Sequence, residues 1–579
     1  MGDILICGRS PHDAMGERLS HALRKAAREE GAEAQDLTPF TWLAASGPRP
    51  VQVVSAGAWT LVGDVLNRRD PGLSHIADEE PWAYEKKLFA RFWGRYIGVR
   101  FDGAGAVKAV LRDASGALDC VAWRQHGLDL VASDIPDWLV RRLAPPWRID
   151  FDRVGDALRD TRLTQADLLL EGPAAVAPGA MRTLPDGDLV PLWTPGRIAR
   201  RSTTVRLPDD EAAGLLRARV EEAVSGLARV SGPLIAEVSG GLDSSIVAAC
   251  LAAEPEADVR QWLNSHGPDP SSDERSYVAA LSRRLDINPT FAARREHRLT
   301  LDDLVRMPQR WRPALSALDT AHDADWADRL RAAGATALFT GKGGDPMFVQ
   351  PVPQTVFADL LADRGWRALL DPALPALARS AEVSVWTLIA IARGRRRPLG
   401  DPPMDFHPPS LGPPPRHPWL EDLDGIGPAK TYQVANLIYA LTVQGPSLRD
   451  AVVDVFNPLL AQPVVETCLS LNMAQLTLGR RDRALARRAF ADRLPEAILR
   501  RRSKGEQTAL YGRALAGGLD VLRPWLLEGR LAAEGLLDRA ALDAHLTRES
   551  LAWRGGYGEV LTLAAFEGWV RAWEARLSC

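Results

Sequence analysis

Seven consecutive residues near the middle of the 579-residue chain combine the backbone freedom and the side-chain donors of a phosphate-binding loop: Ser239, Gly240, Gly241, Leu242, Asp243, Ser244 and Ser245. The glycines let the backbone approach a ligand closely, and the serines add hydroxyl donors. Asp243 would repel a phosphate unless a cation lay between them. A magnesium ion, which binds one or two carboxylates together with phosphate oxygens, would supply that cation. The stretch therefore predicts a site for phosphate groups and Mg²⁺.

The segments on both sides of this loop have the patterns of a strand and a helix. Residues 234–238 form a short apolar run that is typical of a buried strand, and the apolar residues 246–251 continue as a helix. The unpaired N–H groups and the dipole at the start of such a helix favour an anion. The alternative interpretation is a turn in which the serines and Asp243 only cap the helix. The strand and helix stand where phosphate binding requires them, which favours the phosphate site.

Composition and charge are those of an ordinary globular protein, with 46% hydrophobic and 25% charged residues. The length suggests two to four domains. The formal net charge is -3 and the basic residues are dispersed, so we expect no nucleic-acid partner. One local cluster, residues 393–397, contains four arginines, and we interpret it as a solvated loop flank.

Cysteine usage and hydrophobic run lengths indicate where the protein works. The five cysteines lie far apart and form no metal-ligand pair, which fits a reducing compartment. The apolar run at the N-terminus is too short for a signal peptide, and no run approaches the length needed to cross a bilayer. We therefore expect a cytoplasmic protein without a membrane partner.

The first third of the chain has the pattern of an antiparallel β domain. Residues 95–102, 106–111, 117–123 and 128–134 alternate between apolar and polar side chains and are separated by Gly or Asp turns. This pattern predicts stacked antiparallel sheets. The domain is predicted to span residues 1–198.

The remaining residues, 199–579, alternate between helical and strand patterns. A helix is predicted over residues 211–228, strands over 259–264 and 335–340, and a further helix from Ser272. Such alternation predicts a parallel sheet with a ligand at the carboxyl ends of its strands. Residues 398–418 contain nine prolines and are predicted to form an extended surface segment, a linker rather than a lid.

Several motifs give the chain a resemblance to a known family. The phosphate loop resembles that of the ATP pyrophosphatases. Residues 112–116 and 131–134, together with 172–179 and 193–195, resemble the glutamine-hydrolysing domain of the asparagine synthetase family. The resemblance implies an α/β and α+β protein of two domains. These are an N-terminal glutaminase-like antiparallel β-sandwich and a C-terminal parallel α/β ATP pyrophosphatase domain with helical additions.

The N-terminus departs from that family. Its glutaminases use an N-terminal cysteine, exposed after removal of Met, whose α-amine serves as the base. This chain has Gly2 there, and Cys7 lies too far along to offer both a thiol and an α-amine. The resemblance therefore implies a domain that keeps the fold without making ammonia, so that the nucleophile is another amine.

The resemblance also assigns roles to residues in the second domain. The glycine-rich turn containing Gly343 and Gly344 ends in Asp345, which matches a magnesium ligand of the family and would share the ion with Asp243. Asp454 stands where the family has a glutamate beside the reacting carbonyl, which implies a catalytic base. Lys504 matches the lysine that contacts the α-phosphate and the leaving pyrophosphate, and would stabilise charge in the transition state.

Within the family, residues 343–348, 458–469 and 479–490 look most like those of lasso peptide cyclases. This resemblance implies ATP and Mg²⁺ as cofactors and a ribosomal precursor peptide as substrate. It also implies a leader-peptide-binding protein and a leader peptidase as partners. The implied reaction is adenylation of an Asp or Glu side chain of the peptide, followed by attack of its N-terminal amine to close a macrolactam.

Three other functions remain open at this point. A β-lactam synthetase or an ammonia-dependent asparagine synthetase would share the phosphate motifs and would equally lack the glutaminase cysteine. A pocket wide enough for a peptide would separate these from a cyclase. A non-catalytic peptide-binding scaffold would not release pyrophosphate.

Overall fold

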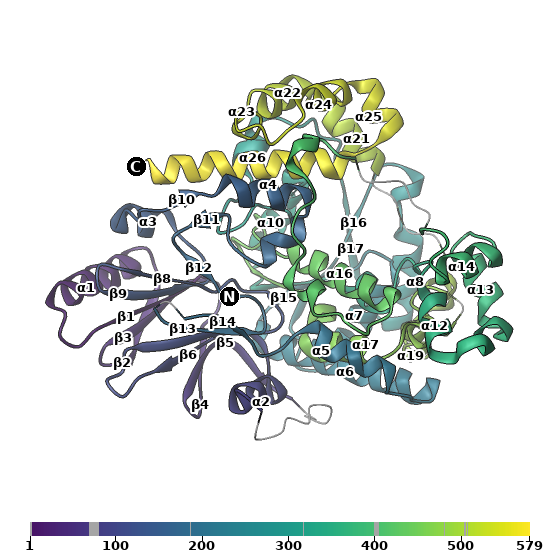
Figure 1. Ribbon diagram of the computed structural model, residues 1–579, viewed down its shortest axis with the longest axis horizontal. Coiled ribbons are helices and arrows are strands. Elements are labelled where there is room, and N and C mark those ends of the chain that lie inside the picture. The colour runs from purple at the N-terminus through teal and green to yellow at the C-terminus, as the bar shows by residue number, and fades with distance from the viewer. Residues whose placement is uncertain are drawn as a thin grey trace.

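The N-terminal domain contains two stacked six-stranded antiparallel sheets, in a computed structural model that describes residues 3–68, 80–185, 187–316, 318–398, 404–479, 481–502, 505 and 508–578 (Figure 1). The strands of the first sheet, in spatial order, are β12 (Ala174–Ala175), β8 (Val121–Gln125), β9 (Leu128–Ala132), β1 (Ile4–Arg9), β3 (Thr41–Ala45) and β2 (Glu33–Thr38). Those of the second are β14 (Leu189–Pro191), β13 (Ala180–Thr183), β7 (Val107–Arg112), β6 (Phe92–Phe101), β5 (Trp59–Asn67) and β4 (Gln52–Ala56).

Alternate residues of the two sheets meet in a common core. Ile6 and Leu43 of the first sheet pack with Val62, Ile97 and Val110 of the second. This is the packing that the period-two pattern of the sequence predicts, because successive side chains of a strand point to opposite faces. The predicted strands and the sandwich are thus confirmed.

The helices of this part are α1 (Ala14–Glu29), α2 (Ala83–Arg91), α3 (Asp137–Leu143), α4 (Phe151–Arg159) and α5 (Pro195–Ala199). The short strands β10 (Arg148–Ile149) and β11 (Leu170–Glu171) pair with each other as an antiparallel ribbon.

The C-terminal part is built on a five-stranded parallel sheet, as predicted. Its spatial order is β17 (Pro289–Ala293), β16 (Val259–His266), β15 (Leu234–Glu237), β18 (Ala337–Phe339) and β19 (Asp454–Phe456). The interior strands β15 and β18 are short runs of mostly buried residues, as expected for strands with both faces covered. Their carboxyl ends lead into the phosphate loop and the glycine-rich turn.

Helices surround this sheet and fill the rest of the chain. Those up to the glycine-rich turn are α6 (Asp209–Ser231), α7 (Leu242–Ala252), α8 (Arg275–Leu285), α9 (Leu301–Arg306), α10 (Thr320–Ala332) and α11 (Gly344–Phe348). The middle group is α12 (Val356–Arg364), α13 (Ala373–Ser380), α14 (Val385–Ala392), α15 (Pro418–Glu421), α16 (Pro428–Thr442), α17 (Gln462–Ser470), α18 (Met473–Leu476), α19 (Ala484–Ala489) and α20 (Glu496–Arg500). The last group is α21 (Thr508–Gly517), α22 (Leu519–Leu527), α23 (Arg530–Ala533), α24 (Arg539–His545), α25 (Arg548–Arg554) and α26 (Tyr557–Leu577).

The C-terminal helix α26 returns to the N-terminal domain and lies across it (Figure 1). Trp573 of this helix stacks on Trp311, and both rings contact Trp147 of the N-terminal domain. The two domains therefore share one buried aromatic cluster.

Two sequence predictions need correction. The helix predicted from Ser272 begins at Arg275, because residues 270–272 form a 3₁₀ turn first. The proline-rich segment does not lie wholly on the surface. Within its described part, residues 404–418, Phe406 and His417 are buried, and Phe406 packs among the C-terminal helices.

No single helix among the described residues is long and apolar enough to cross a membrane. Within the part of the chain that the structure describes, one bent pair, α13 and α14 with 97° between them, has the length and composition for it.

Candidate active site

The predicted phosphate loop connects β15 to α7 in the way the sequence indicated. Gly240 has a φ of +77°, a left-handed conformation that glycine adopts without strain. The Ser245 hydroxyl donates to the Gly241 carbonyl at 2.7 Å, and the Ser239 amide donates to the Ser244 hydroxyl at 3.2 Å. No described side chain caps the start of α7. The capping interpretation therefore lacks support, and the amides at the start of α7 are available to an anion.

The glycine-rich turn after β18 lies directly against this loop. A Cβ on Gly341 would stand 2.4 Å from the Ser244 amide nitrogen, and one on Gly344 would stand 2.3 Å from the Asp243 carboxyl carbon. Only glycine permits backbones and side chains to approach so closely. The turn thus brings Asp345 beside Asp243, as the sequence analysis predicted for a shared metal site.

Asp243 and Asp345 converge on one cationic group of the protein. The Arg483 guanidinium nitrogen Nη1 lies 3.2 Å from Asp243 Oδ2 and 3.3 Å from Asp345 Oδ1. Burial lowers the pKa of Arg483, but the carboxylates of Asp243, Asp482 and Asp345 outweigh burial and raise it. Two carboxylates that meet at a single positive charge fit a magnesium ion, which needs few protein ligands when phosphate oxygens supply others.

Arg483 was missed as a site residue by the sequence analysis. It lies in a segment that resembled the cyclases, but no local pattern shows that its side chain reaches two loops more than 130 residues away. Arg483 immediately precedes α19 and has a φ of +49°. A non-glycine residue seldom adopts this left-handed conformation, so it could not be read from the residue type.

A cavity of about 710 Å³ opens from these loops toward the N-terminal domain. Its lining comes from both domains: Asp3, Arg95, Arg112 and Asp134 from the first, and Glu237, Asp243, Lys342, Asp345 and Arg449 from the second. The site is therefore formed jointly, although all its predicted phosphate-binding residues belong to the second domain.

Two charged groups in this cavity were not singled out from the sequence. Burial raises the pKa of Glu237, at the end of β15, although Arg449, Lys342 and Arg294 act in the opposite direction. Burial also lowers the pKa of Lys342 to about 8, with a further contribution from Arg449. The Lys342 ammonium donates to the Val443 carbonyl at 2.8 Å. Lys342 therefore titrates closer to neutral pH than an exposed amine.

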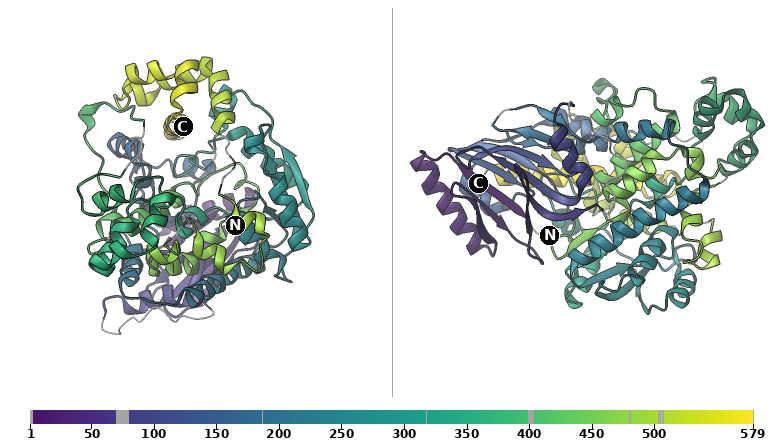
Figure 2. Two further views of the ribbon diagram at one scale, coloured as in Figure 1. Left: turned by 90° about the vertical axis from the view of Figure 1, so that its right-hand side faces the viewer. Right: turned by 90° about the horizontal axis from the view of Figure 1, so that it is seen from below.

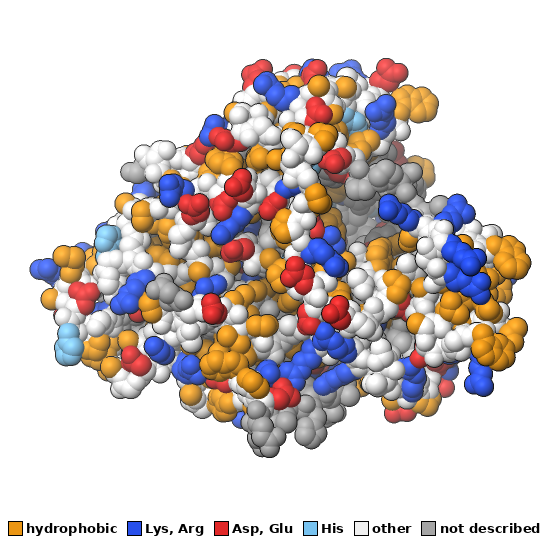
Figure 3. Space-filling view, in the orientation of Figure 1, with side chains coloured by type: hydrophobic (Ala, Val, Ile, Leu, Met, Phe, Trp, Pro, Cys, Tyr) orange, Lys and Arg blue, Asp and Glu red, His pale blue; other side chains and the backbone are white. Residues whose placement is uncertain are grey.

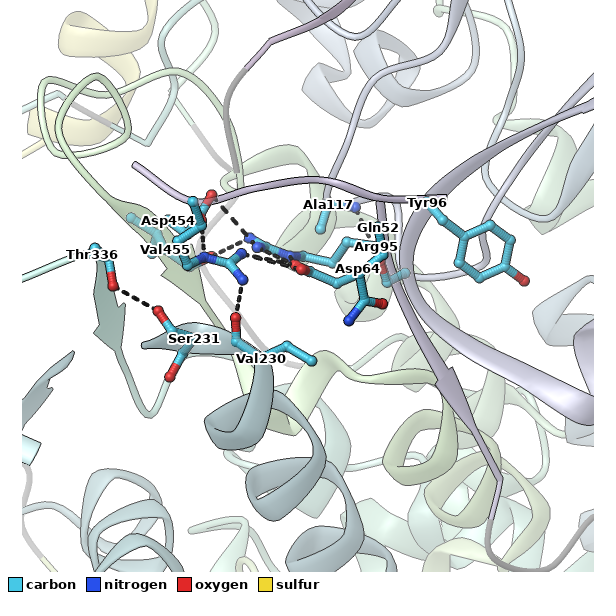
Figure 4. Close-up of polar contacts among 12 residues, drawn as sticks. Gln52, Asp64, Arg95, Tyr96, Ala117, Val230, Ser231, Thr336, Asp454 and Val455 are labelled. Carbon is cyan, nitrogen blue, oxygen red and sulfur yellow. Dashed lines mark hydrogen bonds and ion pairs between the residues drawn. The ribbon is translucent and has the colours of Figure 1, made fainter. Parts of the chain in front are cut away.

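Asp454 makes the contacts of a buried ion pair (Figure 4). One oxygen lies 2.6 Å from Arg49 Nε, and the other lies 3.6 Å from Arg95 Nη2. Both arginines also bind Asp64 of β5. Asp454 begins β19 and pairs with Ala337, the first residue of β18, so it stands at the amino-terminal end of these strands, and it lines the same cavity as the phosphate loop. Its predicted role as a base stays a prediction.

Lys504 and Gly2 lie outside the described residues. The chain on both sides of Lys504 contacts the loop region: Arg501 donates to the Gly240 carbonyl at 3.1 Å, and the Gly505 amide donates to Glu274 at 3.0 Å. The predicted role of Lys504 therefore stays a prediction. Cys7 is buried in β1, where burial raises the pKa of its thiol to about 12, so it offers no ready thiolate.

The comparisons with known proteins agree with this geometry. A family model described as asparagine synthase matches residues 215–571, which include the phosphate loop, the glycine-rich turn, Asp454 and Arg483. The comparison with curated proteins gives no match. The arrangement can hold a polyphosphate by backbone amides and hydroxyls, with two carboxylates placed for its metal ion.

Proposed function

The chain belongs to the asparagine synthase family of ATP-dependent ligases, and we propose that within this family it is a lasso peptide cyclase. The observation that supports the nucleotide chemistry is the convergence of Asp243 and Asp345 beside the open start of α7. The peptide substrate is supported by the cavity, which extends from that point to the N-terminal domain. Its mixed charges suit a peptide that carries both a free amine and an acidic side chain.

In the proposed first step, a side-chain carboxylate of the peptide attacks the α-phosphorus of ATP. A new O–P bond forms, the bond to pyrophosphate breaks, and an acyl-adenylate results. The amides at the start of α7 and the hydroxyls of Ser239 and Ser244 would hold the departing phosphates. Magnesium, when bound by Asp243 and Asp345, would neutralise phosphate charge that otherwise repels the carboxylate. Lys504 is proposed to contact the leaving pyrophosphate.

In the proposed second step, the peptide's N-terminal amine attacks the acyl carbon and AMP leaves. An α-amine has a pKa of roughly 7.7 to 8.0, so part of it is already neutral at pH 7. The product is an isopeptide bond that closes a ring. Holding the folded peptide in the cavity would replace an improbable encounter of its two ends by a fixed geometry.

We propose Glu237, in addition to Asp454, as a group that can accept the proton of this amine. Asp454 is held by two guanidinium groups. The side chain of Glu237 makes no hydrogen bond or ion pair with another described residue, and like Asp454 it lines the cavity. Glu237 lies two residues before the phosphate loop. A carboxylate in that position would attract the ammonium form of the peptide and take up its proton on ring closure.

The proposed function is tested with synthetic peptides that carry an N-terminal glycine and, in a series, an Asp or Glu at different positions along the chain. A cyclase would release pyrophosphate and AMP in equal amounts and convert the peptide to a product lighter by one water. The Asp243→Asn variant would form neither. Amide formation from free aspartate with ammonia, or from a small β-amino acid, would instead support the two related synthetases. Absence of pyrophosphate with every substrate would support the scaffold.

A leader-peptide-binding protein and a leader peptidase are proposed as partners on the same grounds. The peptide's N-terminal amine must be free before ring closure, so a hydrolytic enzyme has to act on the precursor first. Mixing the chain with the two partners and an uncut precursor would then give cyclic product, whereas the chain alone would not.

A further inference from the structure

Large apolar side chains stand exposed on a projecting group of helices remote from the cavity. Trp366 and Leu370 lie on a 3₁₀ helix (Gly365–Leu370), and Trp386 lies on α14. Their exposed fractions are 68%, 75% and 79%. Burying a tryptophan removes more apolar surface from water than burying almost any other side chain, so exposure of this extent in two of them is unfavourable for a surface that only meets solvent.

The helices that carry these residues are themselves unusually apolar. None of the eight residues of α14 is charged, and only Leu388 and Ile391 are buried. The neighbouring α13 meets α14 at a bend of 97°, and neither is long enough to cross a bilayer. Short apolar helices with exposed tryptophans are suited to lying at the boundary between water and lipid head groups.

A cluster of arginines follows α14 in the sequence. Residues Arg393, Arg395, Arg396 and Arg397 come immediately after α14, and all four are exposed. Between residues 364 and 398 there are seven arginines and only two acidic residues, Asp371 and Glu382. Figure 3 shows hydrophobic and basic side chains gathered at the right-hand end of the molecule, over α13 and α14. The sequence alone suggested a solvated flank for these arginines, because it did not show the tryptophans beside them.

We propose that this surface, residues 364–398, docks on an anionic lipid bilayer. The indole rings and the apolar face of α14 would enter the head-group region, and the arginines would contact lipid phosphates. The sequence analysis expected no membrane partner from the lack of a spanning run, and a surface that lies on the bilayer needs no such run. A second copy of the chain fits less well, since two such surfaces would bring like charges together.

The place of this surface in the fold leaves the active site accessible. The right-hand view of Figure 2 shows α12 to α14 projecting at the end of the molecule opposite the N-terminal sheets. The cavity opens between the two domains and includes no residue of this surface. Docking through this surface would therefore bury none of the residues that line the cavity.

The test is sedimentation of the full-length protein with vesicles of phosphatidylcholine alone or with 30% phosphatidylglycerol. We expect binding to the anionic vesicles only, weakened at least tenfold by raising the salt from about 0.05 to 0.5 M. The double variant Trp366→Ala/Trp386→Ala and the triple variant Arg395→Glu/Arg396→Glu/Arg397→Glu should each lose at least tenfold in binding. Circular dichroism would verify that both variants remain folded.

The matched control is Trp553→Ala. Trp553 is 85% exposed on α25, outside this surface, and its loss should leave vesicle binding unchanged. Equal binding of the wild type and both surface variants would overturn the proposal, and so would failure of the wild type to bind anionic vesicles. Binding to soluble polyglutamate without binding to vesicles would overturn it in favour of an acidic protein partner.

Discussion

The two aspartates beside the phosphate loop carry the proposed nucleotide chemistry. Arg483 lies between them in the structure, at hydrogen-bonding distance from each. A guanidinium in this place balances the two negative charges and holds the loops together. When a metal ion and phosphates enter, the same arginine is positioned to contact phosphate oxygens.

Replacing Asp345 by Asn should lower the ATP-dependent rate at least 100-fold. The amide keeps the shape of the side chain but removes one of the two carboxylate charges that would bind the metal ion. Initial rates of pyrophosphate release at several Mg²⁺ concentrations would measure the loss, which added Mg²⁺ should partly restore. Asp302→Asn, on the exposed surface of α9, is the control and should be unchanged. A normal rate in Asp345→Asn would rule out its role as a ligand.

Replacing Glu237 by Gln should impair ring closure more than adenylation. The raised pKa of Glu237 means that its carboxylate takes up a proton at a higher pH than usual. Protonation of the peptide amine should lower the rate of ring closure in both proteins as the pH falls. The wild type should lose additional rate as the pH falls through the pKa of Glu237, and the variant should lack this additional loss. Substrate-dependent exchange of pyrophosphate into ATP should persist in the variant. If wild-type exchange is absent, the cyclase proposal itself fails; if the variant closes rings normally, only Glu237 is wrongly assigned.

Lys342 should make stability depend on pH. Its pKa is about 8 in the folded protein against 10.5 when exposed, so between these values the unfolded chain holds a proton that the folded protein lacks. The contribution of Lys342 to stability is therefore full above about pH 10.5 and is lost as the pH falls through about 8. The Lys342→Met variant lacks this dependence. The free energy of unfolding of the variant minus that of the wild type should therefore fall by up to about 3 kcal/mol from pH 7.5 to 10.5.

Urea unfolding at a series of pH values would measure this difference. The exposed Lys108→Met on β7 should show no such trend. A constant difference between Lys342→Met and the wild type would mean that Lys342 is solvated and charged throughout this range.

At the scale of elements, the loop that follows β15 and the turn that follows β18 form the site because glycine lets them touch. Gly341 and Gly344 are the contact points. The sequence predicted both loops correctly, since strand, glycine turn and helix are local patterns. It could not predict their partners. Arg483 and the buried Phe406 reach their positions through packing between distant segments. The charge of Arg483 and the prolines around Phe406 favoured a surface position for each.

Gly344→Ala should therefore damage the site without unfolding the protein. The new methyl group would meet the Asp243 carboxyl carbon at 2.3 Å, so the two loops must separate. We expect affinity for Mg·ATP to fall at least tenfold, measured by calorimetry. Gly214→Ala on α6, where a methyl group meets nothing within 4 Å, is the matched control. It should bind nucleotide normally and be more stable by about 0.5–1 kcal/mol. Equal affinity in Gly344→Ala would show that the loops tolerate separation.

For the whole molecule, the N-terminal domain supplies part of the frame of the active site. Arg49 and Arg95 reach from that domain to Asp454 of β19, and Arg49 also donates to the Val230 carbonyl at the end of α6. Burial raises the pKa of Asp64, but Arg95 and Arg49 outweigh burial and lower it. Arg49 and Asp454 are 405 residues apart, which is why their pairing was not visible in the sequence.

Removing Arg49 should destabilise the contact between the domains. Arg49→Met removes one of the guanidinium groups that neutralise the buried carboxylates of Asp64 and Asp454, and loss of one partner from a buried ionic group costs about 3–5 kcal/mol. Differential scanning calorimetry should show a lower unfolding temperature. Arg206→Met breaks an exposed pair with Asp363 and should cost no more than about 1 kcal/mol. Equal effects of the two substitutions would mean that the buried network contributes little.

The measurement that tests the central claim most directly is a crystal structure with Mg²⁺ and a non-hydrolysable ATP analogue. The account predicts the triphosphate along residues 239–245, with the carboxylates of Asp243 and Asp345 both bound to its metal ion and Arg483 turned toward phosphate. A nucleotide bound elsewhere, or a metal ion that contacts neither aspartate, would contradict it.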